Sequence, residues 1–463
     1  MNDKFWRPQT LNLDKPLYIA IADAVEKDIR SGVLKPGQKL PPQRELADSI
    51  GVNLSTITRA FRECEIRGLI FGTVGRGTYI APDVHVPVAM NSARNTEQEL
   101  VEMGLILPLY NIDEKNASEI GSILQTTDLA PLLRYSEPSG LLHHRAAGSE
   151  WINRYGLSTT PHDILVTSGS QNALACCLMA LFNSGDRIAV DAFTYPGIKT
   201  LASMLGIRLV PIEMDESGMN PAALAVACRR DNIRGVFLMP EVQNPTTVAL
   251  SDLRREELAA LIKKHDLVLI EDESYGFIGR LAQTALSSLV PEHGIYIAGI
   301  SKLLGAGLRI SFIAVPERFR NHLEKAILNT VWMASPINAE IVSRLLISDK
   351  ANTIIQAKRQ EARARMELAV AKLSSYTTYS RPEGFFFWML LPNGWTGREF
   401  ELAAQAKGVK IFCAEKFMVG NKRPFPAVRV SLTGPETQAD LNRGLDVLVS
   451  ILSNHHGEAE MIF

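Results

Sequence analysis

The sequence contains few cysteines and no excess of charge of either sign. Its five cysteines are an odd number without a C-x-x-C pair, so they indicate neither a disulfide framework nor a zinc ribbon. We therefore expect no metal site and a reducing, cytoplasmic environment. The 49 basic and 50 acidic residues give a net charge of -1, which excludes a protein coated in basic charge. One small basic module within the chain is compatible with this balance.

The chain also lacks a long, purely apolar run. Residues 1–16 do not contain the apolar stretch of a secretory signal. Residues 164–185 carry no formal charge and are long enough to span a bilayer, but polar side chains interrupt them. Their purely apolar part covers only residues 173–182. We expect a buried helix there and no membrane partner.

The composition is that of an ordinary globular protein with more than one domain. Hydrophobic residues make up 46% and charged residues 21%, which excludes a largely disordered or fibrous chain. A length of 463 residues predicts two or three domains. Residues 1–82 hold 12 basic and 9 acidic residues, a net charge of +3, so the remainder carries -4. This asymmetry has the sign expected for a nucleic-acid module on an acidic body.

The N-terminal pattern predicts three helices followed by a hairpin. Apolar residues recur every four positions in the first helix, and glycines follow the first and third helices. The expected helices cover residues 16–31, 44–50 and 55–67, and the expected strands cover residues 69–71 and 78–81. This order predicts a winged helix-turn-helix domain over residues 14–82, followed by a linker over residues 83–105.

The predicted helix-turn-helix supplies candidate DNA contacts. Its second helix would enter the major groove, where short polar and basic side chains reach base edges. Any single residue also fits a solvated helix face, since Arg59 and Glu63 can form an i,i+4 pair. The ordered set favours double-stranded DNA, and its members are Arg44, Ser55, Thr56, Thr58, Arg59, Arg76 and Gly77.

Residues 31–81 closely resemble the winged helix-turn-helix of the GntR family, which implies binding of a DNA operator. Members of that family often carry an arginine just after the turn and another four residues later. This chain has Leu54 and Thr58 at those positions. The departure shifts the expected DNA contacts toward Arg44, Arg59 and the wing.

Beyond the linker, short apolar strands alternate with helices. This alternation predicts an α/β body over residues 106–455, with a mainly parallel sheet that helices cover on both faces. After about residue 335 the pattern changes to long helices and a few strands, which predicts a smaller α/β subdomain. The expected strands are residues 164–167, 187–190, 208–212, 235–239, 267–270, 295–298, 310–315, 385–391 and 427–432.

Lys302 stands in a glycine-rich turn directly after an apolar strand. Burial there would lower the pKa of its amine and free the amine to form a Schiff base. Arg309, seven residues later, could pair with a phosphate. Taken alone, however, a surface lysine beside a loop explains this pattern better.

Three further segments place polar groups at the ends of apolar strands. Together they favour a functional Lys302 over a surface lysine beside a loop. The turn at residues 168–170 opens a helix whose free N–H groups would bind an anion, although such turns are common. Asn244, beside a proline, can donate to a phenolate or belong to an ordinary turn. Asp272 and Tyr275 end a third strand, and a buried acid there suggests a cationic partner such as a pyridinium nitrogen.

Together these segments resemble the fold-type I aminotransferases, which use pyridoxal 5'-phosphate, from about residue 105 onward. The resemblance implies that Lys302 forms the internal aldimine and that Asp272 keeps the pyridine nitrogen protonated. Further implied roles are ring-oxygen contacts by Tyr275 and Asn244, ring stacking by Tyr195, phosphate contacts by Ser170, Gln171 and Arg309, a bidentate grip on a substrate carboxylate by Arg429, and contact of Tyr135 with the phosphate of a neighbouring subunit. The last role implies a homodimer.

Two positions depart from the aminotransferase pattern. Many relatives have a serine three residues before the lysine, where this chain has Gly299, so we expect one phosphate contact to be missing. The usual glycine after Asn-Pro-Thr is Thr247, which predicts a reshaped loop. Neither change removes an essential chemical group.

A GntR-type reader ahead of an aminotransferase-like domain is the layout of the MocR family of bacterial transcription regulators. The main hypothesis is a regulator that senses an amino compound or amino acid by aldimine exchange at Lys302. One alternative is a working aminotransferase with a regulatory DNA-binding module, and another is a sensor of the cofactor level. An effector-dependent change in DNA binding would favour the regulator, and turnover to a keto acid would favour the aminotransferase. A DNA response to the cofactor without any amine would favour the sensor of the cofactor level.

Overall fold

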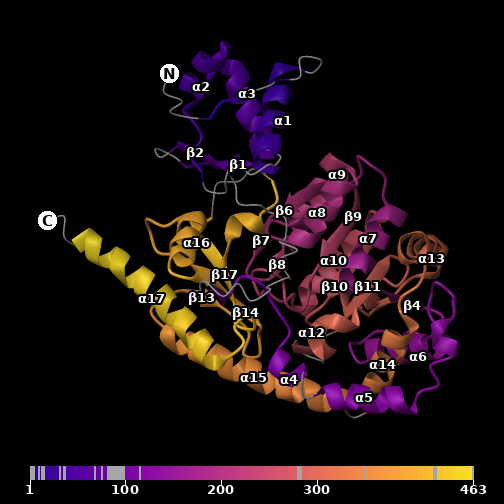
Figure 1. The fold of residues 1–463 in the computed structure, drawn as a ribbon. Helices are drawn as coiled ribbons and strands as arrows, with labels where there is room; N and C mark the ends of the chain where they lie inside the picture. The colour runs from indigo at the N-terminus through magenta and orange to yellow at the C-terminus, as the bar shows by residue number, and fades with distance from the viewer. Residues whose placement is uncertain are drawn as a thin grey trace. The chain divides into compact units, whose positions relative to one another are not determined.

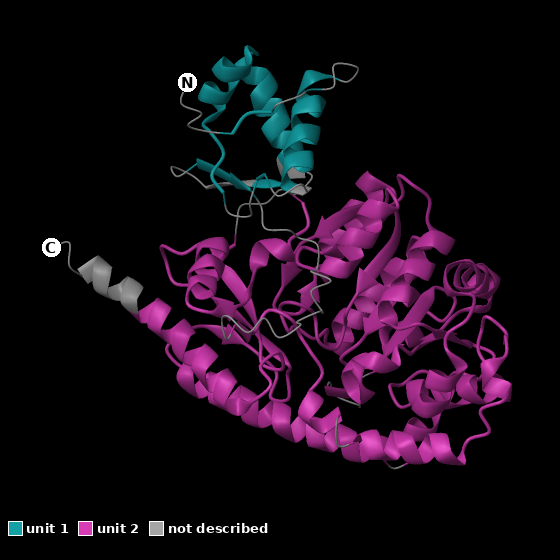
Figure 2. Ribbon diagram, in the orientation of Figure 1, with its two compact units in different colours: residues 1–95 teal, residues 96–463 magenta. Residues whose placement is uncertain are grey.

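The computed structural model describes residues 6–8, 11, 16–30, 33–34, 38–66, 69–73, 77–80, 100–113, 116–278, 284–348, 350–420 and 425–460. The chain forms two compact units, residues 1–95 and residues 96–463 (Figure 2). Most of the predicted linker, residues 83–99, lies outside the described residues.

The first unit consists of three helices and a two-stranded hairpin, in the order that the sequence predicts (Figure 1). Its strands are antiparallel, with Ile70 opposite Ile80. Apolar side chains at helical spacing, including Ile21, Ile57 and Phe61, pack into one buried cluster that holds the helices together. The elements are α1 (Leu17–Arg30), α2 (Gln43–Ile50), α3 (Leu54–Ile66), β1 (Ile70–Thr73) and β2 (Gly77–Ile80).

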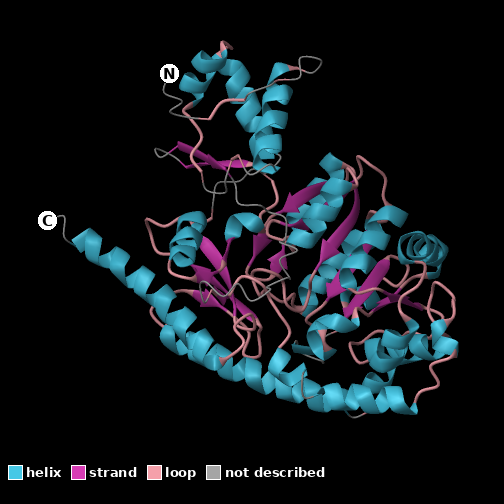
Figure 3. Ribbon diagram, in the orientation of Figure 1, coloured by secondary structure: helices cyan, strands magenta, loops and turns pink. Residues whose placement is uncertain are grey.

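The second unit is built around a seven-stranded sheet (Figure 3). The strand order across it is β4-β12-β11-β10-β9-β5-β6, and among these strands only β12 runs antiparallel to its neighbours. This arrangement confirms the predicted mainly parallel sheet. The bounds are β4 (Ile164–Thr167), β5 (Arg187–Asp191), β6 (Arg208–Ile212), β9 (Ile233–Leu238), β10 (Val268–Glu273), β11 (Gly294–Gly299) and β12 (Ser311–Ala314).

Helices cover both faces of this sheet. Successive strand residues alternate between two apolar clusters: Ile188 and Val190 join one, whereas Ala189 joins the other. The helices are α4 (Tyr110–Asp113), α5 (Ala117–Thr126), α6 (Leu142–Asn153), α7 (Ser170–Leu181), α8 (Pro196–Met204), α9 (Pro221–Asp231), α10 (Asp252–Lys264), α11 (Leu286–Leu289), α12 (Ser301–Leu304), α13 (Glu317–Val331) and α14 (Pro336–Ile347).

A second, antiparallel sheet forms the smaller subdomain that the sequence predicts. Its strand order is β13-β14-β17-β16, and long helices pack on it. The elements are α15 (Lys350–Lys372), β13 (Thr378–Tyr379), β14 (Phe386–Leu390), α16 (Gly397–Ala406), β16 (Phe412–Cys413), β17 (Ala427–Ser431) and α17 (Gln438–Glu460).

Two short strand pairs complete the second unit. β7 (Met214–Asp215) and β8 (Gly218–Met219) form a small hairpin. β3 (Val101–Glu102) pairs in parallel with β15 (Val409–Lys410) of the smaller subdomain. Because β3 belongs to the folded body, the body begins before residue 106, and the predicted linker end at residue 105 is too late.

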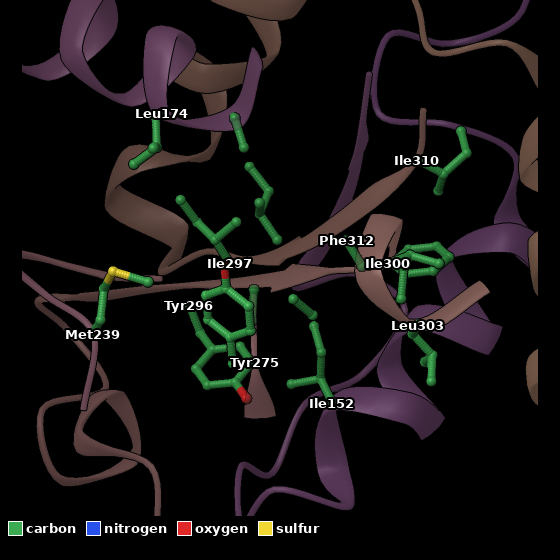
Figure 4. Packing of buried hydrophobic residues seen from close by; sticks show 14 of the residues in the cluster. Ile152, Leu174, Met239, Tyr275, Tyr296, Ile297, Ile300, Leu303, Ile310 and Phe312 are labelled. Atoms are coloured by element: carbon green, nitrogen blue, oxygen red, sulfur yellow. The ribbon is translucent and has the colours of Figure 1, made fainter. Parts of the chain in front are cut away.

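Residues 164–185, the uncharged segment that is long enough to span a bilayer, lie largely in the protein interior. It forms β4 and α7, and several apolar side chains of α7, such as Leu174 and Leu178, are buried, whereas Met179 is 42% exposed. Figure 4 shows part of this cluster, in which Leu174 of α7 and Phe312 of β12 are members. Among the described residues, no helix is long and apolar enough to cross a bilayer.

Candidate functional site

Lys302 lies in α12, directly after β11, where the buried neighbours Leu303 and Leu304 anchor the short helix. Its part-buried Nζ donates a hydrogen bond to the Ile106 carbonyl. Burial lowers the pKa of Lys302 to about 8, and the nearby positive charges of Arg429, Lys358 and Arg309 act in the same direction. About one tenth of this amine is therefore neutral and nucleophilic at pH 7, compared with almost none at the ordinary pKa of 10.5.

Asp272 lies near the carboxyl end of β10 and is only 3% exposed. It accepts hydrogen bonds from the Ser274 backbone N–H at 3.2 Å and from the Ser274 hydroxyl at 2.6 Å. Burial raises the pKa of Asp272 to about 6, against the opposing effect of these bonds. Within the described part of the chain Asp272 forms no ion pair, so a ligand cation would be its natural partner.

Arg429 projects from β17 and is 4% exposed. Its Nη1 donates to Asn244 Oδ1 at 2.7 Å, its Nη2 donates to the Gly104 carbonyl, and its guanidinium lies 4.7 Å from the Phe417 ring centroid. Its buried Nε has no hydrogen-bond partner among the described residues. Burial lowers the pKa of Arg429 to about 10, so the group remains charged at neutral pH.

Aromatic side chains surround these charged groups. Tyr195 precedes α8, and its hydroxyl donates to Gln171 Oε1 at 3.1 Å. Tyr275 is 5% exposed and meets the Phe386 ring edge to face at 5.5 Å. Burial raises the pKa of Tyr195 to about 12 and also raises the pKa of Tyr275. Both phenols are therefore neutral hydrogen-bonding groups at physiological pH.

The start of α7 forms an anion cradle with Arg309. Gly169 precedes the helix with a φ of 85°, and a Cβ atom there would lie 2.5 Å from Arg309 Nη2. The guanidinium therefore packs against glycine backbone, and its Nη1 donates to Ser301 Oγ at 3.3 Å. Free N–H groups at Ser170 and Gln171, together with this arginine, suit a phosphate.

The two departures from the aminotransferase pattern have local explanations. A Cβ atom at Gly299 would lie 2.7 Å from Ser170 Oγ and 2.9 Å from Ser274 Oγ, so hydroxyls of neighbouring residues already occupy that space. Thr247 adopts a φ of 64°, the left-handed conformation that glycine favours. Thr247 therefore adopts the backbone conformation that glycine favours, and reshaping of the loop relative to the aminotransferases stays a prediction.

The structure brings most of the predicted body residues into one site. Electrostatic interactions connect Arg429 with Tyr195, Tyr275 and Lys302, and connect Asp272 with both tyrosines. The residues of this site, called the Lys302 site below, are Ser170, Gln171, Tyr195, Asn244, Asp272, Tyr275, Lys302, Arg309 and Arg429. Tyr135 stands apart: it is 82% exposed and its ring lies 5.4 Å from that of Trp332.

Sequence reasoning missed a buried ion pair that supports Lys302. Lys358 on α15 is 0% exposed, contacts Asp113 Oδ1 of α4 at 2.5 Å and donates to the Lys302 carbonyl at 3.1 Å. It also missed Asp191 at the end of β5, whose pKa burial raises to about 7 while Gln243 donates to it at 3.3 Å. An acidic residue ending an apolar strand was an available signal for Asp191.

The first unit presents polar residues on the exposed face of α3. Gly51 ends α2 with a φ of 68° and lets the chain turn into α3. Asn53 Oδ1 accepts from the backbone N–H and the hydroxyl of Ser55, both at 2.9 Å. Thr58 donates to Gln43 Oε1 of α2 at 2.9 Å and so links the two helices.

The basic residues of this unit differ in their contacts. Arg44 is exposed on α2, whereas the exposed Arg59 lies over the Tyr18 ring at 4.3 Å. Arg62, which sequence reasoning missed, is exposed on α3 one turn after Thr58. Three further residues were predicted to contact DNA. Thr56 is partly exposed, and Gly77, with a φ of 114°, is the first residue of β2. Arg76 lies outside the described residues.

Two family models match the chain. The model for aminotransferase class I and II matches residues 114–448, and the model for bacterial regulatory proteins of the gntR family matches residues 17–80. The uncharacterized HTH-type transcriptional regulator YdeF of Bacillus subtilis (strain 168) is 39% identical over 453 residues, which are 97% of this chain and 97% of that protein. The regulator YdfD of the same strain is 28% identical over 428 residues, 86% of this chain and 89% of that protein.

Solved structures agree on the fold of the second unit. LysN, an alpha-aminoadipate aminotransferase from Thermus thermophilus, superposes with a TM-score of 0.69 at 24% identity. The match covers 77% of this chain and 92% of that structure. The chain therefore belongs to the aminotransferase class I and II family and, with its GntR domain in front, is an HTH-type transcriptional regulator of the MocR type.

Proposed function

We propose that this regulator binds double-stranded DNA through its first unit, holds pyridoxal 5'-phosphate at the Lys302 site, and senses an amino compound that also carries a carboxylate. The observation that carries the proposal is the juxtaposition of Asp272, Lys302 and Arg429. None of the three forms an ion pair within the described part of the chain, although they lie in one largely enclosed site. Unpaired charges of both signs require a ligand that supplies their partners.

The residues present fit pyridoxal phosphate. When bound, the cofactor supplies an aldehyde carbon that condenses with primary amines. Ser170, Gln171 and Arg309 would hold its phosphate, and Asp272 would pair with the pyridine nitrogen. Tyr195 would stack on the ring, whereas Tyr275 and Asn244 would hydrogen-bond the ring oxygen.

Lys302 would act as the exchangeable amine of the site. With a pKa of about 8, its Nζ both holds and releases a proton near neutral pH, so an incoming amine can take its place. Arg429 would bind the carboxylate of the effector, because its planar guanidinium has an unused Nε and lies among aromatic rings that exclude water. The effector class is therefore an amino acid.

Both of these cations hydrogen-bond to the segment that follows the linker. Lys302 donates to the Ile106 carbonyl, and Arg429 donates to the Gly104 carbonyl. An effector that engages Lys302 and Arg429 competes for both donors and frees the two carbonyls. Since residues 104–106 continue in sequence from the linker, ligand binding is coupled to the chain that leads to the DNA reader. Such coupling requires the effector to prefer one arrangement of this segment.

A homodimer is part of the proposal. Large apolar side chains are exposed around Tyr135, which suits burial against a second copy. They include Leu129 at 37%, Leu133 at 74% and Trp332 at 54% exposure. A dimer would carry two DNA readers, and joining two weak readers raises affinity through effective concentration. A fragment of residues 1–95 should then bind the operator much less tightly than the full chain.

An absorbance titration of the full chain tests the proposal. Cofactor-loaded protein is titrated with amino acids and with matched amines that lack the carboxylate, and mobility shifts on the neighbouring genomic DNA are recorded in parallel. An amino acid that changes both the cofactor spectrum and DNA binding supports the proposal. Spectral changes without any DNA binding would overturn it.

The second candidate function is a working aminotransferase with a DNA-binding module. The specific observation in its favour is that no essential chemical group of the Lys302 site is missing, so Lys302 could shuttle the proton of a transamination. Repeated turnover of the amino acid to a keto acid, when a second keto acid is supplied as the amino-group acceptor, would favour this function. A DNA response to cofactor without any amine would instead indicate a sensor of the cofactor level.

A further inference from the structure

Outside the Lys302 site, two adjacent histidines of α6 meet a glutamate of α14. The two helices lie side by side (Figure 1). His143 Nε2 lies 2.7 Å from Glu340 Oε2, and His144 Nε2 lies 3.0 Å from the same oxygen. The three ligand atoms all lie within 4.8 Å of one another. The cluster is partly enclosed, because His144 is 1% exposed and the Glu340 side chain 10%, whereas His143 is 58% exposed.

The convergence of both rings on one oxygen is built into the packing of the two helices. Adjacent residues of a helix point about 100° apart, so two neighbouring imidazoles ordinarily diverge. Here the two ring centroids are only 4.1 Å apart and the rings are inclined by 59°. Arg344, one turn after Glu340, donates from Nε to the other carboxylate oxygen at 2.7 Å. This bond orients the carboxylate and leaves Oε2 to the histidines.

We propose that His143, His144 and Glu340 bind a divalent transition-metal ion, of which Zn²⁺ is the representative, and that this ion links α6 to α14. Imidazole nitrogens and one carboxylate oxygen suit zinc, nickel and copper, and do not suit magnesium or calcium, which prefer oxygen ligands. The proposal departs from the expectation from composition that the chain has no metal site.

The ligand separations can be compared with those that a bound ion requires. Zinc bonds of about 2.0–2.1 Å in a tetrahedron place neighbouring ligand atoms about 3.3 Å apart. The observed separations from the two Nε2 atoms to Glu340 Oε2, 2.7 and 3.0 Å, are about 0.6 and 0.3 Å shorter than this value, and the three ligand atoms all lie within 4.8 Å of one another. Glu340 is otherwise held by Arg344, a second partner of the kind that orients metal-binding carboxylates. The exposed side of His143 leaves room for water as a fourth ligand.

The alternative is that the same three side chains form a hydrogen-bonded bridge without an ion. Glu340→Gln separates the two cases, because glutamine still accepts a hydrogen bond from imidazole but provides no charged ligand. His143→Ala removes the most exposed of the three side chains and so disturbs the fold least. His162→Ala is the matched control, since His162 pairs with one glutamate, Glu317, at 3.0 Å and belongs to no cluster of metal-ligating side chains among the described residues.

The experiment is a calorimetric titration of chelator-treated full-length protein with Zn²⁺, with the visible spectrum of bound Co²⁺ as a second readout. We expect one Zn²⁺ per chain, a tetrahedral Co²⁺ spectrum and a raised melting temperature. His143→Ala and Glu340→Gln should each weaken this binding at least about tenfold, whereas His162→Ala should not. Equal Zn²⁺ binding by His143→Ala, Glu340→Gln and the parent protein, or no binding by the parent, would overturn the proposal. None of these readouts involves pyridoxal phosphate, so the result is independent of the proposed function.

Discussion

The two units of this regulator carry their candidate functional residues in opposite ways. In the first unit, the side chains of Arg44 and Ser55 are exposed to solvent. In the second unit, Asp272 and Arg429 are 3% and 4% exposed, and burial shifts the pKa of each. A buried charge without a protein partner requires a ligand, whereas an exposed arginine requires none. The chemistry of a ligand can therefore be inferred for the second unit, but the base sequence of an operator cannot be inferred for the first.

The largest expected effect is at Lys302. Lys302→Ala should abolish the adduct that borohydride fixes between the cofactor and the protein, because the neighbouring amine of Lys358 is held in an ion pair with Asp113. Mass spectrometry of a digest locates the adduct. Lys199→Ala is the matched control, since burial also lowers the pKa of Lys199 to about 8 while its Nζ donates to the Lys416 carbonyl at 2.8 Å. An adduct on Lys199 would show that a lowered pKa alone selects the lysine and would refute the assignment.

The next effect concerns the carboxylate of the effector. Arg429→Ala should weaken binding of amino acids by about 2–4 kcal/mol, because a buried charge pair is lost. Amines without a carboxylate should lose much less. Arg429→Lys keeps the charge but not the planar fork, so it should restore only part of the affinity. Spectral titrations with matched pairs of ligands measure the difference, and an equal loss for both classes would make Arg429 a structural residue.

Asp272 provides a pH-dependent prediction for the cofactor-free protein. Burial raises its pKa to about 6 from the ordinary value of 3.8, so the folded chain holds this proton more tightly than the unfolded chain. Ionisation of Asp272 therefore lowers the free energy of unfolding progressively as pH rises from about 4 to 6, and the full loss of stability remains at higher pH. Asp272→Asn should raise the free energy of unfolding at pH 8 by up to about 3 kcal/mol, and the gain should vanish near pH 4.

Urea unfolding of the cofactor-free protein at the two pH values measures this gain. Adding the cofactor should narrow the difference at pH 8, because the parent protein then obtains a cation for Asp272. If Asp272→Asn is less stable than the parent at pH 8, the protein itself stabilises the carboxylate, and the case for a ligand cation is lost.

The strands and the polar site residues at their ends could be predicted from the sequence, because each produces a pattern among neighbouring residues. β4 (Ile164–Thr167) and β6 (Arg208–Ile212) have the predicted bounds, since buried parallel strands are short apolar runs between turn residues. Asp272 and Lys302 were predicted because polar residues interrupt such runs at strand ends. Their gathering in one site follows from the parallel order of β10 and β11.

The remaining site residues depend on contacts between distant segments. Lys358 looks like a solvated lysine in a long helix, and only the packing of α15 against α4 and α12 reveals that it is 0% exposed. The acceptors Gly104 and Ile106 act through backbone carbonyls, which no side-chain pattern marks. His144 and Glu340 are 196 positions apart and meet because α6 packs on α14.

The smallest expected effect is in the first unit, where an exposed arginine would contribute one phosphate contact. Arg62→Ala should weaken operator binding by about 1 kcal/mol and reduce the salt dependence by about one phosphate contact, similarly for every DNA sequence. Arg62 is a cleaner probe than Arg59, because Arg59→Ala would also remove the contact with Tyr18 on α1. Arg229→Ala, an exposed arginine of α9, is the control for loss of one positive charge. If operator binding by the two variants has the same salt dependence, Arg62 on the exposed face of α3 does not contact DNA phosphates. The first unit would then not bind DNA through this exposed face, and the contrast between an exposed DNA reader and a buried ligand site would be wrong for the DNA reader.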